Sequence, residues 1–174
     1  MTCETNGLNS QSSDIDFWAV ARDLFRIGKR VTLKPLGGSM KPFIWPGDTV
    51  DIDPSQDCTL KFGDIVLYKT SVKKDRAATI IHRVVKIYHE NGEPRIVTRG
   101  DASSKMDDPV TSEQVLGKVT AIQKGKLTLR LDRPVGKAIN RAWSLFQCFP
   151  ISFHAFLAAR RLLRPLHGGR CFLR

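Results

Sequence analysis

Ser39 occupies a position that suits a nucleophile. Residues 37–48 read GGSMKPFIWPGD, so this serine lies between a glycine pair and a Met-Lys-Pro turn, just before a strand-like run. Glycines leave the hydroxyl sterically open, and the proline restricts the chain that follows. A serine hydroxyl becomes reactive only when a neighbouring base removes its proton. The segment therefore predicts covalent catalysis at Ser39, with a base supplied from elsewhere in the chain.

His82 is the best candidate for that base. It stands in the run IIHRVV at residues 80–85, and an imidazole is suited to proton transfer near neutral pH. The other histidines lie beside a turn or in the C-terminal tail. Strand alternation places His82 on the same face as Ile80 and Val84. The alternative interpretation is a half-buried strand histidine with no chemical role.

Strands are the elements expected to position these two residues. The pattern from residue 31 to residue 132 consists of short β-rich runs without helices between them, and Asn91-Gly92 is a strong hairpin signal. Such a series predicts a mostly β, barrel-like domain over 31–132. The expected strands are 31–33, 49–52, 65–68, 79–87, 95–98, 115–122 and 126–131.

The chain before this domain predicts one helix. Residues 1–13 are rich in Ser, Asn, Gly and Thr, and we expect them to be disordered. Asp14 or Asp16 is a suitable N-cap, and apolar residues then recur at helical spacing, which predicts an amphipathic helix over 14–30. This helix packs on the core or, alternatively, lies on a membrane interface.

The C-terminal tail carries the positive charge. The 174 residues have a net charge of +11, and no acidic residue follows Asp132. We predict a basic amphipathic tail over 133–174 whose residues 137–174 bind an anionic membrane surface, with nucleic acid the less favoured partner. Residues 142–159 are uncharged, but Pro150 and the polar residues among them favour a surface position over a membrane span. A tail folded onto the β-domain is the alternative.

Cysteine usage argues against a metal site. The four cysteines are Cys3, Cys58, Cys148 and Cys171; no pair has CxxC spacing, and no histidine stands at ligand spacing from them. Reduced, unpaired thiols are expected, with no metal and no cofactor. No cleavable signal peptide and no convincing transmembrane helix is evident, so we expect a peripherally membrane-associated or cytoplasmic protein.

Four segments in order resemble the motifs of type I signal peptidases and the related LexA-type serine peptidases. The Ser39 segment resembles their nucleophile motif, and His82-Arg83-Val84 resembles the base motif of the archaeal, endoplasmic-reticulum and sporulation-type branch, where histidine replaces lysine. Residues 98–101 (TRGD), followed by Asp107, resemble the aspartate motif of that branch, and residues 117–119 resemble its closing strand. The resemblance covers about residues 31–122 and implies a signal-peptidase/LexA-like coiled β-sheet barrel.

The resemblance also implies roles for individual residues. Ser39 is the nucleophile, His82 the general base, and Asp101 the carboxylate that orients the imidazole, with Asp107 as the alternative if Asp101 is a turn residue. The peptide substrate binds as an added strand, and residues of the serine turn surround the scissile bond and its oxyanion. These residues are Gly37, Gly38, Ser39, Met40 and Pro42.

Two departures from the family pattern bear on function. Many relatives carry Ser or Thr two residues before the nucleophile as a second oxyanion donor, whereas this chain has Gly37. Signal peptidases usually place a transmembrane helix before the serine, whereas residues 17–30 are too charged to insert.

The expected function is a serine endopeptidase that cleaves a leader or precursor peptide through a Ser-His(-Asp) acyl-enzyme. The alternatives are a LexA-like self-cleaving regulator and a catalytically weak peptide-binding module at a membrane surface. The identity of the substrate and the oligomeric state have no signal in the sequence.

Overall fold

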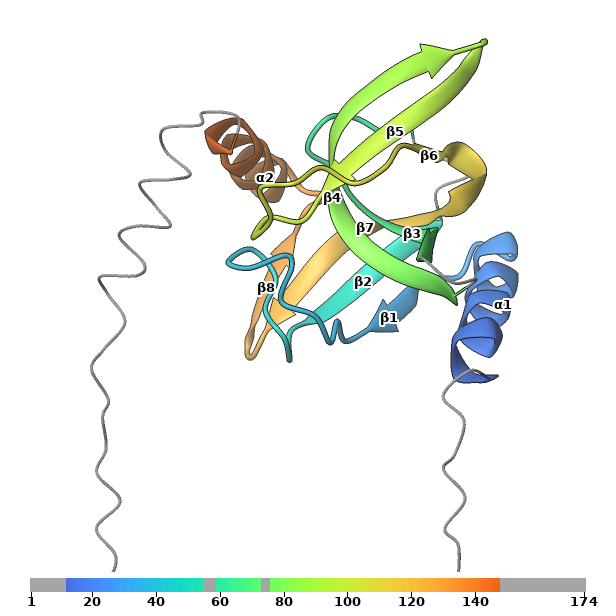
Figure 1. The fold of residues 1–174 in the computed structure, drawn as a ribbon. Helices are drawn as coiled ribbons and strands as arrows, with labels where there is room; N and C mark the ends of the chain where they lie inside the picture. Colours follow the sequence, from blue (N-terminus) through green and yellow to red (C-terminus); the bar gives the residue numbers. More distant parts are fainter. Residues whose placement is uncertain (1–11, 55–58, 73–75, 148–174) are drawn as a thin grey trace, which may run out of the picture.

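The fold is a single twisted antiparallel sheet with one helix at each end, seen in a computed structural model that describes residues 12–54, 59–72 and 76–147 (Figure 1). The prediction of a mostly β fold is confirmed. In chain order the elements are α1 (Ser12–Arg26), β1 (Val31–Leu33), β2 (Thr49–Pro54), β3 (Ile65–Val72), β4 (Arg76–Glu90), β5 (Glu93–Arg99), β6 (Val110–Thr111), a single 3-10 turn (Ser112–Gln114), β7 (Val115–Lys124), β8 (Leu127–Arg130) and α2 (Pro134–Phe146).

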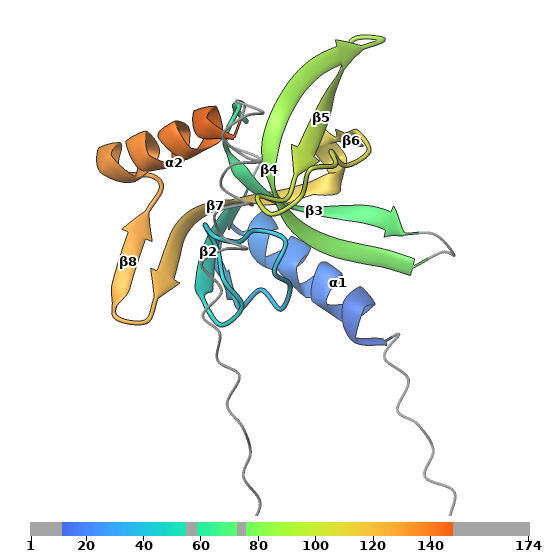
Figure 2. The ribbon, with the colours of Figure 1, turned by 60° about the vertical axis from the view of Figure 1, so that its left-hand side comes forward.

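Strand β7 organises the sheet. The strand order is β1-β2-β7-β3-β4-β5-β6, and β8 also pairs with β7. Strand β2 pairs along one edge of β7 from Gly117 to Gln123, while β3 and β8 share the other edge. The β4–β5 hairpin projects from the rest of the sheet, and α1 and α2 lie at opposite ends (Figures 1 and 2).

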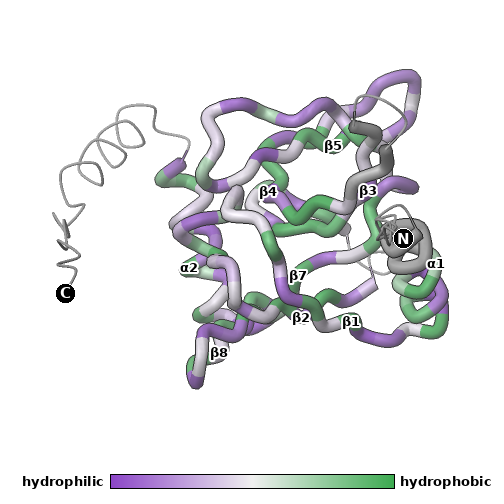
Figure 3. Tube along the Cα trace, turned by 60° about the horizontal axis from the view of Figure 1, so that its bottom comes forward, coloured by the Kyte–Doolittle hydropathy of each residue, from purple (hydrophilic) through white to green (hydrophobic). Residues whose placement is uncertain are grey.

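The two faces of the sheet carry separate hydrophobic clusters. The larger cluster joins α1, β1, β2, β7 and the serine turn through residues such as Phe25, Met40 and Ile44. The smaller cluster includes Tyr68 and Val84, with Ile80 packed against it. Ile80 and Val84 thus share a face, as strand alternation predicts for the neighbours of His82. Figure 3 shows hydrophobic residues along β2 and β7 and hydrophilic residues at the tip of the β7–β8 hairpin.

Helix α1 is shorter at its C-terminal end than the sequence predicts. It begins at Ser12, inside the segment expected to be disordered, and ends at Arg26 rather than at residue 30. Gly28 has a φ of +68°; its N–H donates to Phe25 O, while Lys29 N–H donates to Leu24 O. This pair of bonds is a Schellman motif, which ends a helix because the left-handed residue cannot continue it. Residues 1–11 lie outside the described part.

The expected hairpin at Asn91-Gly92 is confirmed. Both residues have positive φ, 54° and 82°, as a two-residue type I′ turn requires. Strand β4 extends well beyond the predicted 79–87, because its partners β3 and β5 continue the ladder on both sides. Strand β6 was not predicted, because two residues are too few for a periodic pattern.

The first part of the predicted tail is a helix that packs on the β-domain. Helix α2 begins at Pro134, whose fixed φ suits the first helical position, and ends at Phe146. Gly136 lies so close to Arg130 O that a Cβ there would be 1.8 Å from this oxygen. For residues 134–147 the alternative of a tail folded onto the domain therefore applies.

Several expectations fall outside the described residues. The rest of the tail, residues 148–174, and all four cysteines are among them. Within the described ranges, no helix combines the length and the apolar character needed to cross a membrane.

Candidate functional site

The serine turn is held by buried residues on one side and leaves Ser39 exposed on the other. Met40 and Ile44 are buried in the larger cluster, and the N–H of Ile44 donates to Met40 O at 2.9 Å. The Trp45 indole donates to Pro42 O at 2.7 Å, which closes the turn on its outer side. Ser39 itself is exposed. The buried apolar residues of the turn follow Ser39, while Leu36 before it is 94% exposed, so the burial of Met40 and Ile44 leaves Ser39 at the surface.

His82 faces this serine from strand β4. Its Nε2 lies 3.0 Å from Ser39 Oγ, although 43 residues separate the two in sequence. The residue is 8% exposed and pairs in register with Val66 of β3. The central position of β4 in the sheet therefore holds the imidazole in place, and the structure brings together the two residues that the sequence singles out.

Asp107 is the carboxylate that contacts the imidazole. Its Oδ2 lies 2.6 Å from His82 Nδ1 and also accepts hydrogen bonds from Thr98 Oγ1 at 2.7 Å and Tyr68 Oη at 3.0 Å. Burial alone would raise the pKa of Asp107, but the hydrogen bonds from His82 and Thr98 outweigh it and lower the pKa below its usual value. The carboxylate is therefore ionised at neutral pH.

This geometry selects the tautomer of His82. An ionised carboxylate only accepts hydrogen bonds, so the proton on Nδ1 points at Asp107 and the lone pair of Nε2 faces Ser39 Oγ. That is the form in which an imidazole removes a proton from a hydroxyl. Burial raises the pKa of Tyr68, so its hydroxyl keeps the proton that it donates to Asp107.

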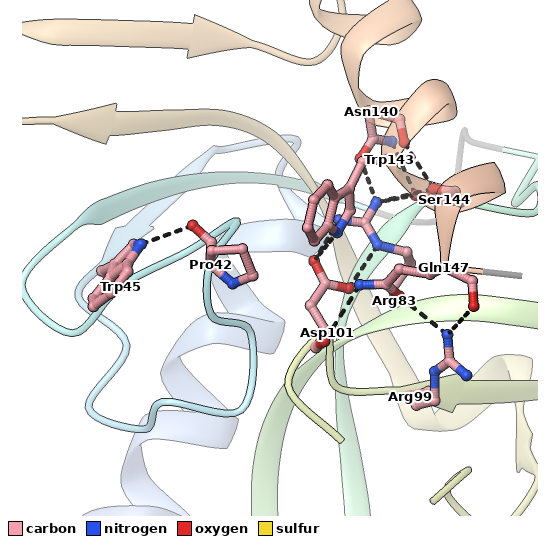
Figure 4. A network of polar contacts seen from close by, with 10 residues as sticks. Pro42, Trp45, Arg83, Arg99, Asp101, Asn140, Trp143, Ser144 and Gln147 are labelled. Carbon is pink, nitrogen blue, oxygen red and sulfur yellow. Dashed lines mark hydrogen bonds and ion pairs between the residues drawn. The ribbon is translucent and has the colours of Figure 1, made fainter. Parts of the chain in front are cut away.

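Asp101, the first choice for the orienting carboxylate, lies elsewhere. It is 1% exposed and forms a bidentate pair with Arg83, at 2.8 Å to Nε and 2.7 Å to Nη2 (Figure 4). The expectation that Asp101 binds the imidazole is therefore corrected in favour of its alternative, Asp107. The physical reason is strand alternation. Arg83 points to the opposite face of β4 from His82, and Asp101 pairs with Arg83 on that face.

Gly100 matters because of the space that it leaves empty. A Cβ there would lie 2.8 Å from Ser39 O and 3.0 Å from His82 Nε2. The adjacent loop also donates a backbone bond, from Ala102 N to Ser39 O at 2.7 Å. A glycine is therefore required where this loop passes the serine and the histidine.

Three contributors to the site were not recognised from the sequence: Tyr68, Thr98 and Gly100. Tyr68 and Thr98 are polar residues in buried strand runs, and such residues usually have a specific hydrogen-bond partner. That signal was present, but it did not identify the partner. The role of Gly100 depends on how closely two distant segments approach, which leaves no local signal.

The oxyanion side of the serine turn is open. A Cβ on Gly37 would meet no atom within 4 Å, whereas one on Gly38 would lie 3.2 Å from Lys41 Cε. No side-chain donor is present at Gly37. The backbone N–H of Ser39 remains the candidate donor for an oxyanion.

An apolar groove of about 470 Å³ opens beside Ser39. Its walls come from the segment before the serine turn and from the part of β4 that leads to His82. Pro35, Gly37 and Ile81 are among the lining residues, as are Ser39 and His82 themselves. A groove between two extended segments has the shape that an extended peptide fills.

Metal chemistry has no visible ligand set here. Within residues 12–54, 59–72 and 76–147, no group of three or more His, Cys, Asp or Glu side chains is arranged to hold a metal ion. The acidic side chain at the site, Asp107, is occupied by hydrogen bonds from its protein neighbours.

Two proteins of known function are similar in sequence to part of this chain. The signal peptidase complex catalytic subunit sec11 of Schizosaccharomyces pombe is 33% identical over 90 residues, which cover 42% of the chain and 46% of that subunit. The signal peptidase complex catalytic subunit SEC11 of Clavispora lusitaniae is 33% identical over 73 residues, 42% of the chain and 41% of the subunit. No family model matches the chain. The chain thus spans less than half the length of these relatives, and the similarity supports a relation to signal peptidases.

Proposed function

We propose that this protein is a serine endopeptidase of the signal-peptidase type, which cleaves a leader or precursor peptide with Ser39, His82 and Asp107. The observation that carries the proposal is the continuous hydrogen-bonded chain from Ser39 Oγ through the imidazole to Asp107 Oδ2, with distances of 3.0 Å and 2.6 Å. Similarity to the two signal-peptidase subunits supports the same class of reaction.

The proposed mechanism follows from the protonation states at the site. His82 Nε2 takes the proton of Ser39 as Oγ attacks the scissile carbonyl, and Asp107 stabilises the imidazolium that results. The negative oxygen of the tetrahedral intermediate accepts a hydrogen bond from the N–H of Ser39. The imidazolium then protonates the leaving amine, and a water molecule activated by His82 hydrolyses the acyl-enzyme.

The groove suggests the kind of peptide segment that enters the site. Its lining is mainly apolar, with Leu33, Ile44 and Leu67 among the residues on its walls. An extended chain satisfies its backbone by pairing with a neighbouring segment and places alternate side chains into such a groove. The proposed substrate therefore presents uncharged side chains just before the cleaved bond.

A peptide-cleavage assay tests the proposal. The full chain is incubated with a defined mixture of synthetic peptides that have apolar and small residues in varied order, and products are identified by mass spectrometry. We expect cleavage at one class of site by the wild type and none by Ser39→Ala, because the base has no hydroxyl to activate.

The matched control is Ser104→Ala, an exposed serine in the loop that leads to Asp107. It should cleave like the wild type. Equal cleavage by wild type and Ser39→Ala would contradict the proposal. A fragment released from the chain itself, seen by intact mass without added peptide, would instead support the self-cleaving alternative. Peptide binding without cleavage would support the binding module.

A further inference from the structure

Helix α2 ends in a cluster of polar side chains that point into the domain rather than toward solvent. Ser144 and Gln147 are 2% and 5% exposed, an uncommon degree of burial for polar residues. Asn140 and Trp143 lie on the same side of the helix, and Figure 4 shows all four around the pair Arg83–Asp101. Polar side chains on the buried side of a helix are suited to binding charged groups, whereas a hydrophobic core requires apolar ones.

These side chains complete the hydrogen bonding of a buried ion pair. Arg83 and Asp101 bind one another through two parallel hydrogen bonds, and Arg83 Nη1 also donates to Gly63 O of the β-domain at 3.0 Å. Arg83 Nη1 is bound by Asn140 Oδ1 and by Ser144 Oγ at 3.2 Å. Trp143 Nε1 donates to Asp101 Oδ2 at 3.1 Å. A buried charge left partly unsatisfied is costly, so α2 is needed for this pair to stay buried.

The same helix holds the backbone beside the site. Gln147 Nε2 donates to Asp101 O at 3.3 Å, and Gln147 Oε1 accepts from Arg99 Nη2 at 3.1 Å. Gln147 therefore contacts the residues on both sides of Gly100. Gly100 is the residue against which the serine and histidine are packed, and Ala102, two residues further on, donates its N–H to Ser39 O.

Each partner of the ion pair is covalently next to a residue of the site. Arg83 follows His82 on β4, and Asp101 follows Gly100. A shift of the ion pair is thus transmitted directly to the strand that carries the imidazole and to the loop that touches Ser39. The pair lies in the interior of the β-domain, and apart from the bond from Arg83 Nη1 to Gly63 O its further side-chain hydrogen bonds come from α2.

We propose that α2 is part of the active-site scaffold, with Trp143 and Gln147 as positioning residues that hold the ion pair and thereby the distance between Ser39 Oγ and His82 Nε2. This inference rests on the proposed peptidase function. Neither residue lines the apolar groove, which lies on the side of the serine turn toward residues 33–37. Their loss should therefore slow the chemical step and leave binding of the substrate almost unchanged.

The test separates these two effects in the full chain. The substrate is the p-nitrophenyl ester of N-acetylalanine, which needs acylation of Ser39 but no long peptide. Trp143→Phe keeps an aromatic ring beside Phe43 and Phe146 and removes the N–H donor together with part of the indole. Gln147→Ala removes both contacts of the amide. We expect each to lower kcat about tenfold, with KM within about twofold of the wild type, because small misplacements of reacting atoms are costly.

A spectroscopic measurement tests the scaffold without any substrate. The proton on His82 Nδ1 that is hydrogen-bonded to Asp107 should give a resolved, strongly deshielded NMR resonance in the wild type. It should broaden or move in both variants. Leu145 lies on the same helix and is 50% exposed. Leu145→Ala is therefore the matched control and should change neither kcat nor the resonance. If Gln147→Ala does not fold, Gln147→Glu replaces it, since it keeps the acceptor for Arg99 and lacks the amide donor.

The outcomes distinguish the two proposals. Wild-type kcat and an unchanged resonance in both variants, even with a lower melting temperature, would overturn the positioning role and leave α2 as a stabilising element. Equal ester hydrolysis by wild type and Ser39→Ala would overturn the peptidase function instead. In that case the resonance still decides whether α2 holds the His82 environment.

Discussion

At the scale of single residues, the site combines one well-supported carboxylate with one open position. Asp107 accepts from His82, Thr98 and Tyr68 on the same oxygen, so its charge and orientation are set by three neighbours. Gly37 has no such neighbours, and the space around it is empty. The base side of the site is therefore more fully built than the oxyanion side.

Gly37→Ser should increase activity. The substitution meets no atom within 4 Å, and it places a hydroxyl two residues before the nucleophile. One added oxyanion donor lowers the barrier in the transition state, so we expect kcat for a cleaved peptide to rise about tenfold or more. Gly37→Ala is the control, because it adds the same Cβ without a donor. An equal effect of both substitutions would show that the hydroxyl does not bind the oxyanion.

Asp107→Asn should change both catalysis and acid stability. The neutral amide does not stabilise the imidazolium, so kcat should fall by a factor on the order of 10⁴. Because the folded protein lowers the pKa of Asp107, the carboxylate contributes stability above its unfolded pKa of about 4, and this contribution is lost as pH falls through the folded value.

Thermal unfolding at pH 7 and at pH 3 checks the second part of this prediction. The melting temperature of the wild type should decrease more between these pH values than that of the Asn variant, which has no proton to gain. An identical decrease in both proteins would mean that Asp107 has no stabilising role when ionised.

At the scale of elements, the site depends on a loop passing close to a turn and a strand. The loop after β5 crosses the serine turn at Gly100, and the backbone bond from Ala102 N to Ser39 O holds the crossing at 2.7 Å. The same loop continues to Asp107, whose N–H returns to Thr98 O at 2.8 Å. This one connection therefore holds both the backbone next to Ser39 and the carboxylate of Asp107 in place.

Gly100→Ala should inactivate the protein more than it destabilises it. The added Cβ would lie within 3.1 Å of Ser39 O, Ser39 Cβ and His82 Nε2, so the serine and histidine must separate. A displacement of about 1 Å can reduce the rate by about 100-fold, and we expect a loss of kcat of at least that size.

The control for this substitution is Gly125→Ala in the β7–β8 turn. Gly125 has a φ of +58° and nothing within 4 Å, so alanine there costs about 1–2 kcal/mol of backbone strain far from the site. Its melting temperature should fall while its kcat stays at the wild-type value. A parallel loss of kcat in both variants would indicate that activity simply follows stability.

At the scale of the whole molecule, one buried ion pair connects the sheet, the site loop and the C-terminal helix. The guanidinium of Arg83 also lies 4.7 Å from the centre of the Phe43 ring, which adds the serine turn to the same contact. A charged pair that is 1% and 0% exposed is not expected to add much net stability, because desolvation offsets its attraction. The pair instead fixes the relative positions of four segments: the sheet, the loop after β5, helix α2 and the serine turn.

Arg83→Met should be strongly destabilising. It leaves the Asp101 carboxylate buried without its counterion, at a cost of about 3–5 kcal/mol. We expect the melting temperature to fall by roughly 6–20 °C. Arg130→Met is the control, because its pair with Asp132 is 42% and 36% exposed and is screened by solvent.

A double variant separates the loss of charge pairing from the loss of volume. Arg83→Met combined with Asp101→Leu removes both charges, so much of the stability should return while kcat stays low. A double variant no more stable than Arg83→Met alone would show that packing around the pair, rather than the unpaired charge, determines the loss.

The sequence by itself determined the local parts of this protein. The hairpin at Asn91-Gly92, the face shared by His82 and its strand neighbours, and the open serine turn all follow from backbone preferences and alternation within a few residues. Tertiary structure decided which aspartate contacts the imidazole. Asp101 and Asp107 lie in one short loop, and they differ because Asp101 pairs with Arg83 while Asp107 binds His82. It also decided that the basic segment after Asp132 begins with a helix that binds Arg83, the residue next to His82. The sequence could not show this, since the contacts of Arg83 with Asn140 and Ser144 join residues 57 and 61 positions apart.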